Sequence, residues 1–384
     1  MKIVAAIDSF KGSLSTIQAG NAVRDGALRV YPDAEVSVCP LADGGEGTVN
    51  ALTLEKEENL VTVSVKGPLG APVTAIYGTA ADLSDGKKTA IIEMAAAAGI
   101  TLIRPEERNP LHTTTFGVGE LIRDAVSRGC RSFIVGIGGS ATNDCGIGML
   151  QALGFRFLDE DGAPVGYGAE AVGRIRRIDA SEALPALSEC VFHVACDVKN
   201  PLCGEFGCSA VYGPQKGATP EMIRKMDAWL EGFARLTAEA IGTDLSAVPG
   251  VGAAGGLGFA FLAYLHASLE PGIDLVIRET GLENEICSAD LVITGEGRLD
   301  EQTCMGKAPA GVAALAAKYG IPVIAFSGCV TEGARLCNEH GIHAFFPVLR
   351  TVCTLEDAMN PENAYHNMTD TAEQVFRLIK ALKG

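Results

Sequence analysis

Basic residues are scarce in this sequence, and no run of Lys or Arg occurs. The 384 residues include 31 Lys and Arg against 47 Asp and Glu, which gives a formal net charge of −16. Proteins that bind nucleic acid or anionic membranes need a basic face, so we expect neither partner. A site for an anionic small molecule must then gain its positive charge locally, from a few Lys or Arg and from helix N-termini.

The patterns of zinc sites, disulfide frameworks and membrane spans are also missing. The 12 cysteines form no CxxC pair and no Cys/His cluster at zinc spacing, so we interpret them as reduced thiols. No apolar run of about 18 or more uncharged residues occurs. The N-terminus enters a strand pattern without a signal sequence. These observations favour a cytoplasmic protein.

Aromatic residues make up only 6% of the chain, whereas glycine is abundant, with 46 residues. Alanine-rich helical stretches and glycine-rich loops are typical of an α/β enzyme rather than an all-β protein. Hydrophobic residues make up 47%, enough for large buried cores. Because 384 residues exceed one ordinary core, the length predicts two domains.

Strand and helix patterns alternate along most of the chain, which predicts a mainly parallel sheet. Short apolar strand patterns occur at residues 3–7, 35–40, 132–137, 191–196, 291–294, 323–326 and 344–348, and helical spacing at residues 15–31, 119–128, 221–241 and 308–319. Residues 61–94 instead alternate apolar and polar side chains around turns at residues 68–70 and 85–86, as antiparallel hairpins do.

The expected fold class is therefore α/β, in two parts. Residues 1–60 plus 290–384 are predicted to form a discontinuous Rossmann-like parallel-sheet domain. Residues 61–289 are predicted to form a large inserted α/β domain that contains antiparallel strands. In open parallel sheets, ligands bind at the carboxyl ends of the strands, so the loops at those ends are the candidate sites.

Three such loops carry carboxylates and belong to the predicted Rossmann-like domain or its border. Residues 8–15 combine Asp8 and Lys11 with hydroxyls before a helix, residues 43–48 hold two acids among three glycines, and residues 294–303 hold three acids and Arg298. Helix starts and lysines suit phosphates or acids, and glycines let a backbone approach a ligand closely. An N-cap or a solvated turn would explain only part of each loop.

Three further loops lie in the predicted inserted domain. Residues 136–148 form a Gly/Ser/Thr loop between a strand and a helix, a common phosphate cradle, although no Walker lysine ends it. Residues 196–202 contain Asp197 and Asn200, for which an Asx turn is an equal alternative. Residues 212–218 form a turn with Lys216. Residues 250–255 fit GxGxxG, but no strand pattern precedes them, so we reject a dinucleotide site.

Glycine-rich loops, several acids and scattered Lys and Arg suit phosphoryl transfer, in which catalysis is mainly positioning and charge neutralisation. That chemistry needs oxygen ligands for Mg²⁺, donors for phosphate oxygens and a carboxylate near the attacking hydroxyl. The residues by themselves therefore point to a kinase and leave the substrate open.

The order of these motifs resembles the bacterial glycerate kinase type 1 family. The matching blocks are residues 8–13, 41–48, 138–144, 213–217 and 294–300, which run in order over nearly the whole chain. The resemblance implies ATP and Mg²⁺ as cofactors, D-glycerate as the small-molecule substrate and 2-phosphoglycerate as the product. It also implies a two-domain α/β fold. The tail after about residue 350 carries no matching motif.

We assign hypothetical roles to residues within these blocks and within residues 196–202. The expected catalytic residues are Asp197, the first choice as base, Asp8, the second choice, Lys11 and Arg298. The expected substrate-binding residues are Ser9, Lys11, Asn200, Arg298 and Asp300. The expected ATP-binding residues are Gly138, Gly139, Ser140, Ala141, Thr142 and Lys216, and the expected Mg²⁺ ligands are Asp43, Glu46 and Glu296.

Three alternatives stay open at this point. The enzyme could phosphorylate the 3-position of glycerate, or another small hydroxy acid. A protein of another class, a non-catalytic sensor of a hydroxy acid, would use the same pocket without consuming ATP. The assembly is expected to be a monomer or a homodimer.

Overall fold

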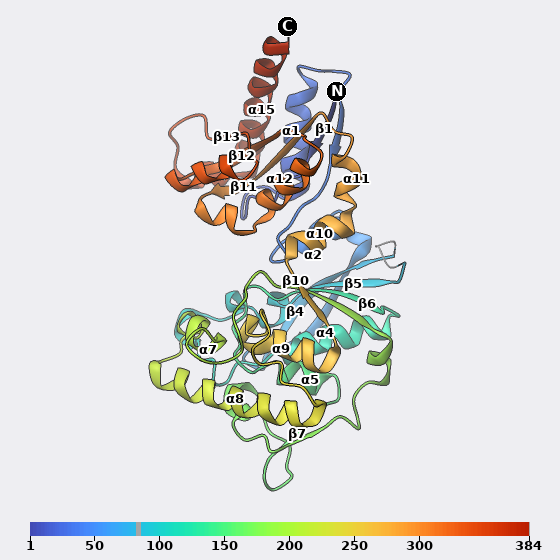
Figure 1. Cartoon of the computed structure of the whole chain (residues 1–384), viewed down its shortest axis with the longest axis vertical. Helices are drawn as coiled ribbons and strands as arrows, with labels where there is room; N and C mark the ends of the chain where they lie inside the picture. The colour runs from blue at the N-terminus through green and yellow to red at the C-terminus, as the bar shows by residue number, and fades with distance from the viewer. Residues whose placement is uncertain (82–85, 384) are drawn as a thin grey trace. The chain divides into compact units, whose positions relative to one another are not determined.

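The computed structural model describes residues 1–81 and 86–383, and the chain divides into two compact units (Figure 1). Unit 1 comprises Met1–Asp43, Asn50–Glu55 and Ile273–Gly384, and unit 2 comprises Gly44–Val49 and Lys56–Gly272. Both units combine helices with a sheet, and unit 1 is assembled from chain segments that lie far apart in the sequence.

Unit 1 contains a five-stranded sheet in which every strand pair is parallel. The strand order is β13-β12-β11-β1-β2. The strands are β1 (Lys2–Ala5), β2 (Glu35–Val38), β11 (Leu291–Leu299), β12 (Val323–Val330) and β13 (Ala344–Pro347). From β1 the chain adds β2 on one side, whereas β11, β12 and β13 lie on the other side. The boundary between β1 and β11 is therefore a topological switch point, where open parallel sheets bind ligands.

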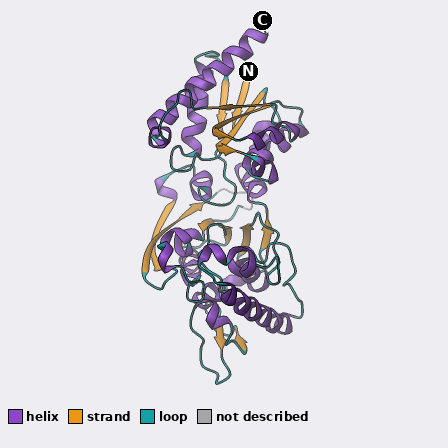
Figure 2. Cartoon of the chain, turned by 90° about the vertical axis from the view of Figure 1, so that its left-hand side faces the viewer, coloured by secondary structure: helices purple, strands orange, loops and turns teal. Residues whose placement is uncertain are grey.

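Helices lie on both sides of this sheet, in the part of Figure 2 that carries the two termini. The helices of unit 1 are α1 (Thr16–Leu28), α10 (Gly272–Thr280), α11 (Leu282–Ile286), α12 (Ala308–Lys318), α13 (Leu336–Glu339), α14 (Leu355–Met359) and α15 (Pro361–Lys383), and α2 (Thr48–Thr53) crosses between the units. Helices α1 and α15 share one hydrophobic core with Ile3 and Ala5 of β1. Because side chains alternate along a strand, the intervening Val4 points to the opposite face.

Helix α1 begins at a capping box. The Ser15 hydroxyl accepts from the Gln18 N–H, and the Gln18 side chain accepts from the Ser15 N–H. This exchange satisfies backbone donors that a helix start leaves unpaired. The helix then packs closely against α15 at Gly26, where an added Cβ would lie 2.7 Å from the Cβ of Ala372. Ser15 therefore serves as the N-cap of α1, as the structural interpretation of this loop predicted.

Unit 2 contains a six-stranded mixed sheet with the order β10-β9-β6-β5-β4-β3. The strands are β3 (Leu60–Lys66), β4 (Pro72–Ala80), β5 (Thr89–Glu93), β6 (Ser132–Gly136), β9 (Val191–Ala195) and β10 (Ser268–Glu270). Strands β3, β4 and β5 pair antiparallel, and the other pairs are parallel. The turn expected at residues 85–86 falls partly on Asp85, which lies outside the described residues.

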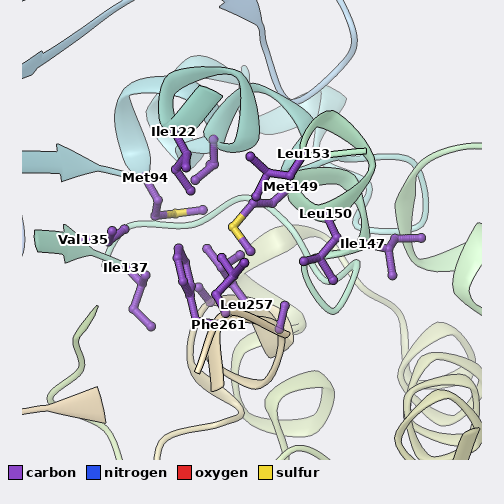
Figure 3. Close-up of a cluster of buried hydrophobic side chains, with 14 of the residues drawn as sticks. Met94, Ile122, Val135, Ile137, Ile147, Met149, Leu150, Leu153, Leu257 and Phe261 are labelled. Atoms are coloured by element: carbon purple, nitrogen blue, oxygen red, sulfur yellow. The ribbon is translucent and has the colours of Figure 1, made fainter. Parts of the chain in front are cut away.

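The central strands of unit 2 are largely buried because helices cover both faces of the sheet. All five residues of β6 are buried. The helices of unit 2 are α3 (Ala95–Ala98), α4 (Phe116–Ser127), α5 (Ile147–Ala152), α6 (Gly168–Val172), α7 (Cys208–Tyr212), α8 (Pro220–Ile241) and α9 (Ala253–Leu265). A separate two-stranded sheet pairs β7 (Arg156–Leu158) antiparallel with β8 (Arg177–Asp179). Figure 3 shows Ile122 of α4, Met149 of α5 and Phe261 of α9 converging on Val135 of β6.

The predicted domain boundaries followed residues 60 and 289, whereas contacts group residues 56–60 with unit 2 and residues 273–289 with unit 1. The first difference arises because Leu60 already pairs with Gly78 in the β3–β4 hairpin. The second arises because α11 packs against α12. No helix within the described ranges is both long and apolar enough to cross a membrane.

The close approach of α1 and α15 gives a test of the unit 1 core. We expect Gly26→Leu to lower the free energy of unfolding by ~1–3 kcal/mol, because the side chain must displace the backbone and Ala372 of α15. Thermal and urea unfolding would measure the change. Gly232→Ala in α8, where nothing lies within 4 Å of an added Cβ, is the control and should be neutral or stabilising by ~0.5–1 kcal/mol.

Candidate active site

A cavity of about 470 Å³ opens at the carboxyl ends of the unit 1 strands. This volume is within the usual range of small-molecule sites. Seven of the residues predicted for the site line this one cavity: Asp8, Ser9, Lys11, Asp43, Glu296, Arg298 and Asp300. They come from the segments that follow β1 and β2 and from the end of β11.

The segment after β1 is held in place by a buried threonine. The Thr16 hydroxyl donates to the Ile7 carbonyl at 2.5 Å and accepts from the Leu41 N–H at 2.8 Å. The Asp8 N–H donates to the Gly295 carbonyl at 2.9 Å. These bonds tie the ends of β1, β2 and β11 together, so the carboxylates that follow each strand face one cavity.

The Asp8 carboxyl is the most perturbed acid of this cavity. Only 5% of the residue is exposed. The pKa of Asp8 is raised to about 7, mainly by burial and also by the nearby carboxylates of Asp43 and Glu296, although the Ser9 N–H, at 2.6 Å, and Lys11 oppose the rise. A carboxyl with such a pKa is divided between its two protonation states near neutral pH, which suits proton transfer.

Glu296 is presented by a strand that is longer than predicted. The sequence placed a loop at residues 294–303, but β11 continues to Leu299 and pairs Glu296 with Ser327 of β12. That prediction is wrong because Gly295, which looks like a loop residue, allows the close approach of the Phe326 backbone in β12 instead. Strand geometry therefore fixes the direction of the Glu296 side chain.

The Glu296 carboxylate has two partners within unit 1. The Thr303 hydroxyl donates to Oε1 at 2.6 Å, and Lys307 Nζ lies 3.5 Å from Oε2. Burial raises the pKa of Glu296, although both partners oppose the shift. Sequence reasoning missed Lys307, which also lines the cavity, because no motif joins it to the acidic block before it.

Arg298 and Asp300 form an ion pair at the mouth of the cavity, with Arg298 Nε 3.4 Å from Asp300 Oδ2. The Arg298 side chain is 65% exposed, so it is free to turn toward an anion. Asp300 accepts from the Gln302 N–H at 2.9 Å and caps the 3-10 turn Glu301–Met305. The Asp300 carboxylate is thus held by the chain, and its contact with a substrate remains a prediction.

The Gly/Ser/Thr loop predicted to bind ATP belongs to unit 2 and follows β6. Lys216, only 2% exposed, donates from Nζ to Ser140 Oγ at 2.8 Å and to the Thr142 carbonyl at 2.6 Å. Burial lowers the pKa of Lys216 to about 8. The structure thus brings Lys216 together with this loop, as an internal support for residues 138–142.

Asp144, which sequence reasoning did not select, holds the other end of this loop. Its fully buried carboxylate accepts from the Thr115 N–H at 2.8 Å, the Thr115 hydroxyl at 2.9 Å and the Gly146 N–H at 3.1 Å. Burial raises the pKa of Asp144, and these donors oppose the rise. The glycine-rich segment at residues 250–255 packs here, since Gly255 accepts from the Cys145 N–H and touches Thr142.

Asp197 and Asn200 follow β9 in unit 2, and both have structural partners. Asp197 Oδ1 accepts from the Gly272 N–H at 2.9 Å, and the residue is exposed. The Asn200 side chain donates to the Phe206 carbonyl at 2.8 Å and accepts from the Tyr212 hydroxyl at 2.6 Å. Both polar groups of Asn200 are therefore engaged within the unit.

The loop at residues 43–48 divides between the units, with Asp43 in unit 1 and Glu46 in unit 2. Glu46 is exposed. Glu93, at the end of β5, accepts from the Gly47 N–H at 3.1 Å and the Val49 N–H at 2.9 Å. Sequence reasoning missed Glu93 because its partners are more than forty residues away in the chain.

An α/β protein with carboxylates and lysines at parallel strand ends, and with a second loop of the phosphate-cradle type, has the parts of a phosphotransferase. The sequence model of the "Glycerate kinase family" matches residues 3–380. The chain belongs to the glycerate kinase family. The family expected from the motifs is confirmed.

Relatives of nearly the same length support this membership. The glycerate kinase of Haemophilus influenzae is 46% identical over 379 residues, which cover 99% of both chains. The glycerate 2-kinase of Escherichia coli is 45% identical over 375 residues, 98% of this chain and 97% of that one. A crystal structure of a candidate glycerate kinase 2 from Salmonella typhimurium LT2 superposes with a TM-score of 0.90 and 47% identity over 100% of this chain and 99% of that one. The α/β fold class is confirmed.

The burial of Asp8 predicts a pH-dependent stability. The folded pKa of Asp8, about 7, exceeds its ordinary value of 3.8. Between these values the folded state binds more protons than the unfolded state, so the protein loses stability as the pH rises from about 4 to about 7. Asp8→Asn should therefore be more stable than the wild type at pH 8 by ~1–4 kcal/mol. The difference should shrink toward pH 4. Urea unfolding at several pH values measures it, with Asp33→Asn, an exposed acid of unit 1, as the control.

The hydrogen bonds of Asp144 predict a cost for a nearly isosteric change. Asp144→Asn replaces one accepting oxygen by an NH₂ group that faces the donors of Thr115 or Gly146. We expect a loss of ~1–3 kcal/mol in the free energy of unfolding. The exposed Asp161→Asn, also in unit 2, should change it by less than ~0.5 kcal/mol. Equal stabilities of the two variants would contradict the buried network.

Proposed function

We propose that the protein is a cytoplasmic kinase that transfers the γ-phosphoryl group of ATP to the 2-hydroxyl of D-glycerate. The products are 2-phosphoglycerate and ADP. Membership of the glycerate kinase family across residues 3–380 supports the reaction, and the similarity to the glycerate 2-kinase of Escherichia coli supports the 2-position. Within the chain, the observation that carries the proposal is the buried Asp8 carboxyl in a cavity that also holds Lys11.

Asp8 is proposed as the proton acceptor. As the substrate hydroxyl oxygen forms a bond to the γ-phosphorus and the bond to the ADP oxygen breaks, the hydroxyl proton passes to an Asp8 carboxylate oxygen. A pKa of about 7 lets Asp8 accept this proton and release it again near neutral pH. Asp197 was the first choice from the sequence, but its exposure and its bond to the Gly272 N–H make it the weaker candidate.

Positive groups of the same cavity are proposed to hold the anions. Lys11 and Arg298 would bind the glycerate carboxylate or the transferring phosphoryl group, because both line the cavity and carry a positive charge. The Ser9 hydroxyl could complete the contact. Lys307 already faces Glu296 at 3.5 Å, so its charge balances that acid before any substrate binds.

Mg²⁺ fits the oxygen donors of this cavity. Asp43 and Glu296 would hold it, since Mg²⁺ in kinases usually binds one or two carboxylates together with substrate phosphates. When bound, the ion neutralises the charge of the phosphates that would otherwise repel these acids. Within the described residues, no group of three or more His, Cys, Asp or Glu is arranged as a metal site by itself. Glu46 remains a predicted ligand.

The backbone amides of residues 138–142 are proposed as donors to phosphate oxygens, except for the Ala141 N–H, which donates to the Ala98 carbonyl at 2.9 Å. Lys216 would act indirectly, because both of its bonds go to this loop and it is almost fully buried. Asn200 is expected to support its own loop rather than the substrate, since both of its polar groups are engaged.

The reaction can be tested by incubating the purified protein with ATP, Mg²⁺ and D-glycerate, and identifying the product by phosphorus NMR. We expect ADP and 2-phosphoglycerate in equal amounts. Formation of 3-phosphoglycerate would overturn the assigned position. Glycerate binding without ATP consumption, also with other hydroxy acids, would overturn the kinase and favour a sensor.

The role of Asp8 predicts different effects for two aspartates. Asp8→Asn should lower kcat by ~10²–10⁴-fold, as loss of a general base does, while the KM for ATP changes little. Asp197→Asn should lower kcat by less than about tenfold. Initial rates from a coupled ADP assay give both values, and thermal unfolding checks that the variants fold. A larger loss of kcat for Asp197→Asn than for Asp8→Asn would return the base role to Asp197.

A further inference from the structure

We infer that the apolar side of the unit 1 cavity is a subsite for the purine base of the donor nucleotide. The inference rests on the proposed kinase function. It adds that the base of the nucleotide, rather than glycerate, occupies the apolar side of the cavity. No sequence motif marks this region, and the ATP-binding residues predicted from the sequence are all in unit 2.

The charged and the apolar side chains that line the cavity come from two different sets of chain segments. Its acidic and basic side chains come from residues 8–43 and 296–307. Its apolar side chains come mostly from residues 348–364, which follow β13 and include helix α14 and the first turn of α15. These residues are Val348, Leu349, Leu355, Ala358, Met359 and Ala364. The ligand that fits this cavity therefore has one charged part and one apolar part.

Of the two substrates, only the nucleotide has such a division. Glycerate consists of a carboxylate and two hydroxyls on a three-carbon chain, so it has no surface to match the apolar side. It is also small for a cavity of about 470 Å³. A purine is flat and largely apolar on its faces, and its triphosphate carries the charge that Lys11 and Arg298 can meet.

The apolar side of the cavity exposes hydrophobic side chains to solvent, and a bound ligand would cover them. Leu355 is 79% exposed, and Leu349 and Met359 are also among the exposed large hydrophobic residues. Single exposed apolar residues are common, but several that gather at one cavity mark a binding surface. A base that packs against them would remove this apolar surface from water.

Two polar groups are placed to meet the edge of a base. Ser13 is a lining residue of the cavity, and its buried hydroxyl has no hydrogen-bond partner within the described part of the chain. Buried polar groups are usually paired, so a ligand atom is the partner that this hydroxyl lacks. Asn367 of α15 also lines the cavity, and its amide offers both a donor and an acceptor, as the edge of adenine does.

The test measures nucleotide binding directly, by isothermal titration of ADP into the full-length protein. Ala358→Phe should fill the subsite and raise the Kd for ADP by about tenfold or more. Leu355→Ala, which removes an apolar contact, should raise it by about three- to tenfold. Val352→Ala is the matched control, because Val352 is exposed in the same segment but does not line the cavity. The control should leave the Kd unchanged.

Two probes separate the base from the phosphates. Adenosine should compete with ADP on the wild type and lose this ability in Ala358→Phe, whereas tripolyphosphate should compete equally with both. Thermal unfolding verifies that each variant folds. An unchanged Kd for ADP in folded Ala358→Phe, or a raised KM for glycerate alone, would overturn the subsite.

These measurements need no turnover, so they also distinguish the subsite from the proposed function. ADP binding that weakens in Ala358→Phe supports the subsite even if glycerate is not phosphorylated. Glycerate phosphorylation with ADP binding insensitive to both variants would leave the kinase standing and remove the subsite.

Discussion

The site in unit 1 depends on one constraint, which is the burial of the Asp8 carboxyl beside two other acids. The constraint arises from the sheet. Parallel strands place their carboxyl ends at one edge, and the Thr16 hydroxyl and the Asp8 N–H tie three of these ends together. Asp8, Asp43 and Glu296 therefore share a cavity although repulsion and desolvation oppose it. Such an arrangement lowers stability near neutral pH, and the catalytic role proposed for Asp8 would account for keeping it.

Unit 2 uses buried charge differently. Lys216 and Asp144 are both almost inaccessible. Lys216 donates to Ser140 and Thr142 of the loop after β6, and Asp144, in the same loop, accepts from Thr115 and Gly146. Because every one of these bonds would be costly to leave unmade in the interior, the loop has one favoured conformation. A rigid loop of this kind can present its backbone amides without losing conformational entropy on binding.

The sequence predicted the features that depend on local pattern. Strand and helix periodicity located most of the sheet and helices, and the rule for strand ends collected seven predicted residues in one cavity. It could not predict the extension of β11, because Gly295 and Gly297 resemble loop residues, and only the pairing of Gly295, Glu296 and Arg298 with β12 continues the strand. It also could not select Glu93, Asp144 or Lys307, whose importance comes from partners that the fold alone brings near. The apolar residues within 348–364 show no periodic pattern in the sequence, so only the cavity in the structure reveals that they lie together.

The protonation of Asp8 connects the fold to the proposed chemistry, so it is the property to measure. Carbon-13 NMR of the protein labelled at aspartate carboxyl carbons can follow each acid through a pH titration, with Asp8→Asn identifying the Asp8 signal. A midpoint near pH 7 is predicted. A midpoint near the ordinary value of about 4 would contradict the account, because Asp8 would then be too weak a base to take the hydroxyl proton.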